Sequence, residues 1–122
     1  MATILIVDDE EPIRSLLAQV LAGAGYQVRQ AMHGGQALEL VAQEIPDLVL
    51  SDVMMPLLDG KELCRQLKSD SATRGIPVIL MTSAGNRAAV GAGADAFLAK
   101  PFDLDEVEAV VKHWLPTAAS SD

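Results

Sequence analysis

The chain has 122 residues and a formal net charge of −8, because nine Lys and Arg stand against seventeen Asp and Glu. This length fits one domain, and the acidic excess excludes the basic surface that binding to nucleic acid or to an anionic membrane requires. Half of the residues are hydrophobic, which excludes a disordered chain, and the single cysteine excludes an internal disulfide. No apolar run reaches the ~18–20 residues of a membrane span, and the start lacks the basic region of a signal peptide. We therefore expect a cytoplasmic domain that makes no direct contact with nucleic acid or membrane.

Short apolar runs, typical of buried strands, alternate with segments of helical periodicity. In chain order the sequence predicts a strand at 4–7, a helix from Pro12 to Gly23, a strand at 26–31, a helix at 34–42, a strand at 48–50, a helix at 61–68, a strand at 78–81, a strand at 96–98 and a helix at 104–115. Between the last two strands, residues 83–93 are rich in glycine and alanine. Because glycine costs about 1 kcal/mol in a helix interior, we expect a shortened or irregular fourth helix there.

The alternation of strand and helix indicates the fold class. Such a pattern predicts parallel strands joined by right-handed crossovers, with helices on both faces of the sheet. The length permits an open sheet of five strands and excludes a closed eight-stranded barrel. We therefore predict an α/β fold, a flavodoxin-like doubly wound parallel sheet of strand order 2-1-3-4-5.

Polar residues follow the predicted strands at their carboxyl ends, where ligands bind in open parallel sheets. They are Asp8 and Asp9, Ser51 and Asp52, Thr82 and Ser83, and Lys100 with Pro101. Three carboxylates in one crevice repel one another, and a hard divalent cation such as Mg²⁺ is the natural compensation. A metal, an ammonium and a hydroxyl around one carboxylate can surround the three oxygens of a phosphoryl group. The sequence therefore predicts that Asp52 is a nucleophile that becomes an aspartyl phosphate.

Six motifs can be read together along the chain. They are ILIVDDE at 4–10, PDLVLSDVMMP at 46–56, DG at 59–60, ILMTSA at 79–84, GAD at 93–95 and FLAKPF at 97–102. In this order they resemble the receiver domain of two-component response regulators, of the single-domain, CheY-like type, from about residue 3 to residue 115. The resemblance implies a receiver domain at 1–116 and a flexible tail or linker stub at 117–122.

The resemblance also implies a role for each matching residue. Asp52 would be the phosphoacceptor, and Lys100 would pair with a phosphoryl oxygen. Thr82 would be the switch hydroxyl, and Phe97 the aromatic side chain that turns inward when Thr82 moves. The implied ligands of Mg²⁺, or of Mn²⁺, are Asp8, Asp9, Asp52 and the backbone carbonyl of Met54. The Lys100–Pro101 peptide bond would be cis.

The implied function is that of a phosphorylatable receiver in phosphorelay signal transduction. The phosphoryl group would come from a sensor histidine kinase or a phosphotransfer protein. Such a domain catalyses its own phosphorylation and dephosphorylation but is not a turnover enzyme. Because 122 residues leave no room for an output domain, we expect the signal to leave through contact with a downstream protein that the sequence does not identify.

Other function classes share this fold. A metal-dependent phosphatase commonly has a second acid two residues after its nucleophile, and Met54 stands at that position. A flavin or nucleotide binder needs a Gly/Ser/Thr phosphate loop after the first strand, where the acidic residues 8–11 would repel a phosphate. A protein-interaction module that is not phosphorylated would have no need of the complete set of site residues.

Overall fold

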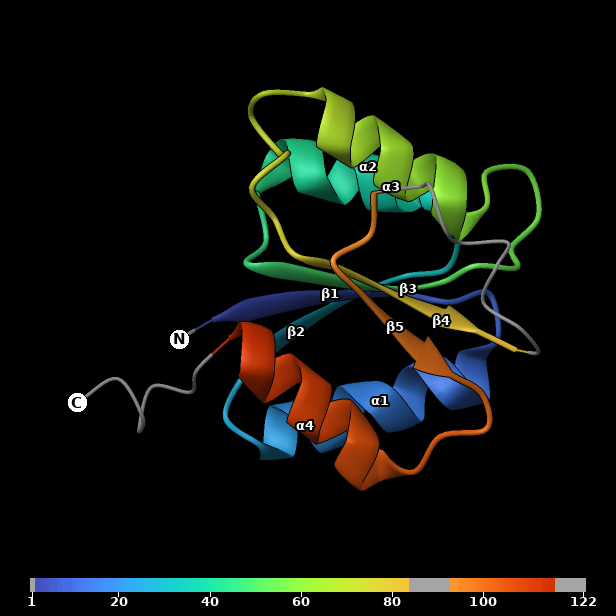
Figure 1. The fold of residues 1–122 in the computed structure, drawn as a ribbon, viewed down its shortest axis with the longest axis vertical. Helices are drawn as coiled ribbons and strands as arrows, with labels where there is room; N and C mark the ends of the chain where they lie inside the picture. The colour runs from blue at the N-terminus through green and yellow to red at the C-terminus, as the bar shows by residue number, and fades with distance from the viewer. Residues whose placement is uncertain (1, 84–92, 116–122) are drawn as a thin grey trace.

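The computed structural model describes residues 2–83 and 93–115, and within them the chain forms an alternating series of strands and helices (Figure 1). The elements are β1 (Thr3–Val7), α1 (Glu11–Gly23), β2 (Gln27–Ala31), α2 (Gly34–Gln43), β3 (Leu48–Asp52), α3 (Gly60–Ser69), β4 (Val78–Thr82), β5 (Ala96–Ala99) and α4 (Leu104–Trp114). The irregular helix predicted between β4 and β5 and the predicted boundary at residue 116 lie outside the described residues. Among those residues, no helix combines the length and the apolar character that a membrane crossing demands.

The strands form one parallel sheet in the order β2-β1-β3-β4-β5, which confirms the predicted fold class and strand order. Val7 of β1 is paired with Ser51 of β3, and Thr82 of β4 with Ala99 of β5. Because all pairs are parallel and in this register, the carboxyl ends of the strands meet at one edge. β3 continues two residues beyond the predicted strand, so Ser51 and Asp52 belong to the sheet itself.

Helices cover both faces of the sheet (Figure 1), with α2 and α3 on one face and α1 and α4 on the other. Successive side chains of a strand point to opposite faces, so each strand supplies two hydrophobic cores. Leu5 and Leu80 pack in the core beneath α2 and α3, whereas Ile4 and Ile79 pack in the core beneath α1 and α4. This arrangement explains why every residue of β1, β3 and β4 is buried.

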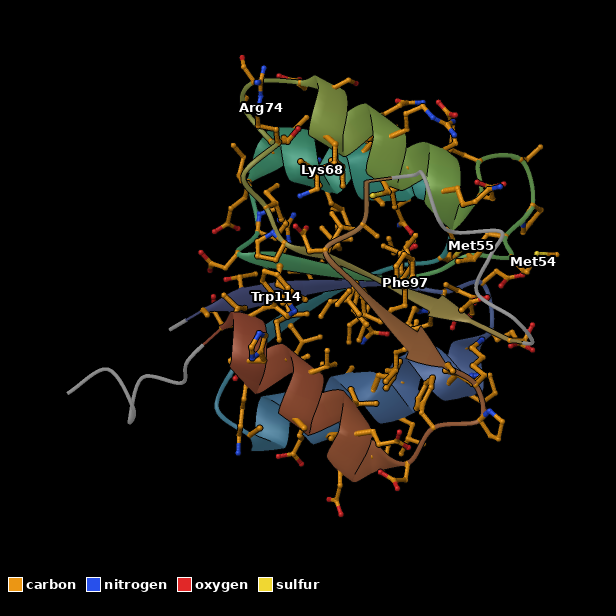
Figure 2. All side chains as sticks on the ribbon, in the orientation of Figure 1. Met54, Met55, Lys68, Arg74, Phe97 and Trp114 are labelled. Atoms are coloured by element: carbon orange, nitrogen blue, oxygen red, sulfur yellow. The ribbon has the colours of Figure 1, made fainter. Side chains whose placement is uncertain are left out.

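A polar network at the amino ends of β4 and β5, opposite the carboxyl edge, holds the start of β5. The Lys68 ammonium at the end of α3 donates to the carbonyls of Arg74 and Ile76 and lies 2.7 Å from Asp95 Oδ2 (Figure 2). The same Asp95 oxygen accepts the Val78 N–H at 2.8 Å. The network ties α3 to the first residue of β4 and to the residue directly before β5, and so anchors the strand that leads to Lys100.

Candidate functional site

Three carboxylates meet at the carboxyl edge of the sheet. Asp8 and Asp9 directly follow β1, and Asp52 is the last residue of the neighbouring strand β3. Each offers one carboxylate oxygen, and these three oxygens all lie within 4.8 Å of one another. The structure thus brings together the acidic residues that the sequence singled out.

The Asp8 carboxylate is buried, and only one of its two oxygens accepts a hydrogen bond from the protein. Its Oδ1 accepts the N–H of Glu10 at 2.9 Å, while Oδ2 has no hydrogen-bond partner. Within residues 2–83 and 93–115, Oδ2 is the one buried side-chain oxygen or nitrogen that has no hydrogen-bond partner. The pKa of Asp8 is raised from 3.8 to about 6, chiefly by burial, with a smaller contribution from the negative charge of Asp52. The hydrogen bond from the Glu10 N–H and the charge of Lys100 oppose this increase. An ionised oxygen without a partner is costly, and it is a ready ligand for a cation.

Asp52 is buried too, but it has a positively charged partner. Lys100 Nζ lies 3.1 Å from Asp52 Oδ1. Burial raises the pKa of Asp52, and the hydrogen bond and charge of Lys100 oppose this increase. Lys100 directly follows β5, and its own N–H donates to the Thr82 carbonyl at 2.7 Å. The Lys100–Pro101 peptide bond is cis, in agreement with the sequence-based expectation.

A pocket of about 420 Å³ opens over the carboxylates. Its lining residues are Asp9, Glu10, Asp52, Met54, Ser83 and Lys100. The two methionines after β3 differ in environment: Met54 is 71% exposed at the pocket, whereas Met55 is buried in the core (Figure 2). Asp52 is therefore accessible from solvent through a pocket with both acidic and basic walls.

The side chain of Ser51 is not part of this pocket lining. Although Ser51 was one of the sequence candidates, it is fully buried, and its hydroxyl donates to the carbonyl of Asp52 at 3.0 Å. Strand alternation explains the difference, since Ser51 and Asp52 point to opposite faces of the sheet. Ser51 thus contacts the backbone of Asp52 rather than a ligand.

Gly60 has a role at the site that sequence reasoning did not assign. It is the first residue of α3, and a Cβ atom built there would lie 2.2 Å from the Asp52 carbonyl oxygen. The N–H of Gly60 also donates to the Val53 carbonyl at 2.9 Å. Only glycine lets α3 begin this close to the backbone of Asp52. The Asp-Gly motif was the available signal, but its cause is a tertiary contact.

Thr82 and Phe97 lie on the same face of the sheet. Thr82 is the buried last residue of β4, and Phe97 of β5 is paired with Leu80, two residues before Thr82. Because side chains alternate along a strand, Leu80 and Thr82 share a face, and Phe97 is half-buried against the core on this face (Figure 2). The two residues with a predicted switch role are therefore neighbours on the α2 and α3 side.

Residues 4–112 match the family described as the response regulator receiver domain. The chain belongs to this family. It is 46% identical over 116 residues to the response regulator MprA of Mycobacterium sp. strain KMS, covering 92% of this chain and 50% of that protein. It is 40% identical over 119 residues to RpaA of Synechocystis sp. strain PCC 6803, described as a DNA-binding dual master transcriptional regulator, covering 94% and 49%. The receiver domain therefore spans about half the length of these curated relatives.

A solved receiver structure has the same fold. The signal receiver domain of a signal transduction histidine kinase from Syntrophus aciditrophicus superposes with a TM-score of 0.89 and 37% identity, covering 94% of this chain and 90% of that chain. Receiver domains act in two-component signal transduction with histidine kinases, and they are not a family of turnover enzymes. The phosphatase and interaction-module alternatives are not favoured.

The site of this receiver domain fits the Mg²⁺ that its family generally binds. All three donors of the cluster are carboxylate oxygens, which are the hard ligands that Mg²⁺ prefers. The unpartnered Asp8 Oδ2 is the most specific indication, because a cation would satisfy the one buried side-chain atom that the described part of the protein leaves unpaired.

Proposed function

We propose that this receiver domain accepts a phosphoryl group on Asp52 and signals through the change that follows. The observation that carries the proposal is the pairing of Asp52 with Lys100 at 3.1 Å beside two further carboxylates. A buried carboxylate held next to an ammonium stays available as an anionic nucleophile. The exposed pocket over it allows a donor to approach.

The proposed reaction is the transfer of a phosphoryl group from a histidine of the donor. A carboxylate oxygen of Asp52 forms a bond to phosphorus while the bond from phosphorus to the donor's imidazole nitrogen breaks. Lys100 then pairs with a phosphoryl oxygen in place of the Asp52 carboxylate. Asp8, Asp9, Asp52 and the Met54 carbonyl would hold Mg²⁺, or Mn²⁺. The bound metal would neutralise charge on the phosphoryl oxygens.

A second pocket suggests where the donor binds. A groove of about 860 Å³ runs beside the phosphoacceptor pocket, and Ser83 and Lys100 line both. Its other walls come from α1, with Ile13 and Leu16, from the segment between β5 and α4, with Phe102, and from the start of α4, with Leu104. Leu16 is 46% exposed there. We propose that a helix of the sensor histidine kinase or phosphotransfer protein binds this groove, since a donor reaching Asp52 must lie beside it.

Phosphorylation would add negative charge and three strong acceptors at the carboxyl edge. The Thr82 hydroxyl can reach these acceptors only if the end of β4 shifts, and Phe97 shares the face on which that shift occurs. We propose that this movement changes the surface that a downstream protein binds. The proposed place of action is the cytoplasm, which is typical of the family.

Incubation with acetyl phosphate and Mg²⁺, followed by intact-mass measurement, tests the phosphoacceptor. We expect one added phosphoryl group that hydroxylamine removes and that is absent in Asp52→Asn. Asp70→Asn, which makes the same change at an exposed carboxylate outside the pocket, should be phosphorylated normally. Failure of the native chain to form an adduct with several donors would refute the proposal.

The donor groove needs a separate test. Leu16→Glu places a charge in the groove without touching the carboxylates. We expect at least a tenfold slower transfer from a phosphorylated histidine kinase and an unchanged rate from acetyl phosphate. Equal rates with the protein donor would show that the donor binds elsewhere.

A further inference from the structure

Arg14 connects α1 to β2 and to the residue that directly follows β1, next to the acidic cluster. It lies on the first turns of α1, and its side chain turns back toward the end of β1. Arg14 Nη1 donates to the carbonyl of Asp8 at 2.8 Å, and Nε donates to Gln30 Oε1 of β2 at 3.2 Å. One half-buried arginine of α1 therefore bonds to a side chain of β2 and to the residue that directly follows β1.

The hydrogen bond from Arg14 to the Asp8 carbonyl holds the peptide group between Asp8 and Asp9. The carbonyl that Arg14 holds belongs to the peptide plane that joins Asp8 to Asp9, and this plane is rigid. The N–H of Asp8 donates to the Ala31 carbonyl at 3.1 Å, and its Oδ1 accepts the Glu10 N–H. Asp8 is thus held through its N–H, its carbonyl and one carboxylate oxygen, which leaves Oδ2 free.

We propose that Arg14 is a positioning residue for the divalent cation of the receiver site, and the proposal rests on the proposed function. By holding the peptide plane between Asp8 and Asp9, it keeps both carboxylates turned toward Asp52. Residues that orient metal ligands affect affinity although they do not touch the metal.

The hydrogen bonds of Arg14, rather than its charge, carry this role. Among the residues that the structure describes, Arg14 forms no ion pair with a carboxylate, and its partners are a carbonyl and a carboxamide. A guanidinium presents several donors in a rigid planar fork, so it can serve both partners in a fixed geometry. A lysine carries the same charge on a flexible stem and lacks that fork.

Calorimetric titration with Mg²⁺ alone tests the proposal on the native chain and four variants. Arg14→Gln should weaken Mg²⁺ affinity roughly tenfold, as is common for residues that orient metal ligands. Arg14→Lys and Gln30→Ala, which retain part of the arrangement, should lose less. Arg29→Gln is the control: it removes the same charge from β2, but the partners of Arg29 are the carbonyls of Leu40 and Glu44 and the Glu44 carboxylate, near the end of α2 and away from the acidic cluster. Its affinity should stay within about twofold of the native value.

Two further readouts separate positioning from general destabilisation. In phosphorylation by acetyl phosphate, Arg14→Gln should raise the Mg²⁺ concentration needed for half-maximal rate and recover the native rate at saturating Mg²⁺. Thermal unfolding without metal should show similar losses for Arg14→Gln and Arg29→Gln. Equal Mg²⁺ affinities of the native chain and Arg14→Gln would overturn this inference alone. A native chain that does not bind Mg²⁺ would overturn the metal part of the proposed function and this inference with it.

Discussion

Lys100 and Asp52 are paired across a strand that lies between them. Asp52 ends β3, Lys100 follows β5, and β4 separates the two strands, yet Nζ lies 3.1 Å from Oδ1. The N–H of Lys100 is also bonded to the Thr82 carbonyl at the end of β4. The pair therefore links Asp52, the proposed phosphoacceptor, to β4 and β5, on which the proposed switch residues lie.

Lys100→Ala separates phosphorylation from the response to it. We expect the variant to form the acetyl phosphate adduct, because Asp52 and the other carboxylates remain. The response should be weak, because no ammonium connects the phosphoryl group to β5. The chemical shift of the Phe97 ring before and after phosphorylation measures this response. Lys112→Ala, on the surface of α4, is the control. A native-like shift of Phe97 in Lys100→Ala would show that its assigned role is wrong.

Asp8→Asn should stabilise the metal-free protein at neutral pH. The raised pKa of Asp8, from 3.8 to about 6, means that ionised Asp8 costs the folded state on the order of 3 kcal/mol. Asparagine removes this charge, so we expect a gain of about 1–3 kcal/mol at pH 7 from urea unfolding. The folded state binds more protons than the unfolded state between pH 4 and 6, so this gain should shrink as the pH falls from 6 to 4. If the difference in unfolding free energy between Asp8→Asn and the native chain did not change with pH, burial of an ionised Asp8 would not be its cause.

Mg²⁺ affinity should fall with pH in the same direction as the gain from Asp8→Asn, because both depend on ionised Asp8. The metal needs the ionised carboxylates, whereas protons compete for Asp8 near its pKa of about 6. We expect nearly constant affinity from pH 7 to 8 and a steep loss below pH 6, measured by calorimetric titration. Affinity that did not change between pH 7 and 5 would exclude Asp8 as a ligand.

Gly60→Ala should displace the backbone of Asp52, the proposed phosphoacceptor. The added Cβ would lie 2.2 Å from the Asp52 carbonyl oxygen, so α3 or the end of β3 must move. We expect a loss of about 1–3 kcal/mol in unfolding free energy and slower phosphorylation. Gly75→Ala is the control, since a Cβ at that position meets no atom within 4 Å. Equal effects of the two substitutions would argue against a specific contact.

Leu57→Gly should stabilise the protein. Leu57 has a φ of 68° in the loop after β3, and its side chain is fully exposed. A left-handed conformation costs an L-residue about 1–2 kcal/mol, and glycine avoids most of this cost. Glycine also loses more conformational entropy on folding, which offsets part of this benefit. We therefore expect a net gain of about 0.5–1 kcal/mol in unfolding free energy. Leu57→Ala keeps the strain and should show little change, and a loss of stability in Leu57→Gly would contradict the expectation.

The alternation of strands with helices and the positions of the strand ends account for most of the features that could be predicted from the sequence. The buried runs indicated β1, β3 and β4 because helices cover both faces of the sheet, and the alternation with helices indicated the strand order. Asp8, Asp52 and Lys100 could be located because the carboxyl ends of parallel strands share one edge. Predicting β3 at 48–50 missed its last two residues, since Ser51 and Asp52 are polar and yet belong to the sheet.

The sequence by itself determined the fold, the family and which side chains gather at the carboxyl edge, because hydrophobic periodicity and strand ends are properties of the chain read in order. Only the tertiary structure decided what each polar atom faces. It directs the Ser51 hydroxyl to the Asp52 carbonyl, brings the guanidinium of Arg14 to the Asp8 carbonyl, and leaves Asp8 Oδ2 without a partner. These relationships depend on how closely α1, α3 and the strands approach one another, and no periodicity in the sequence records that distance.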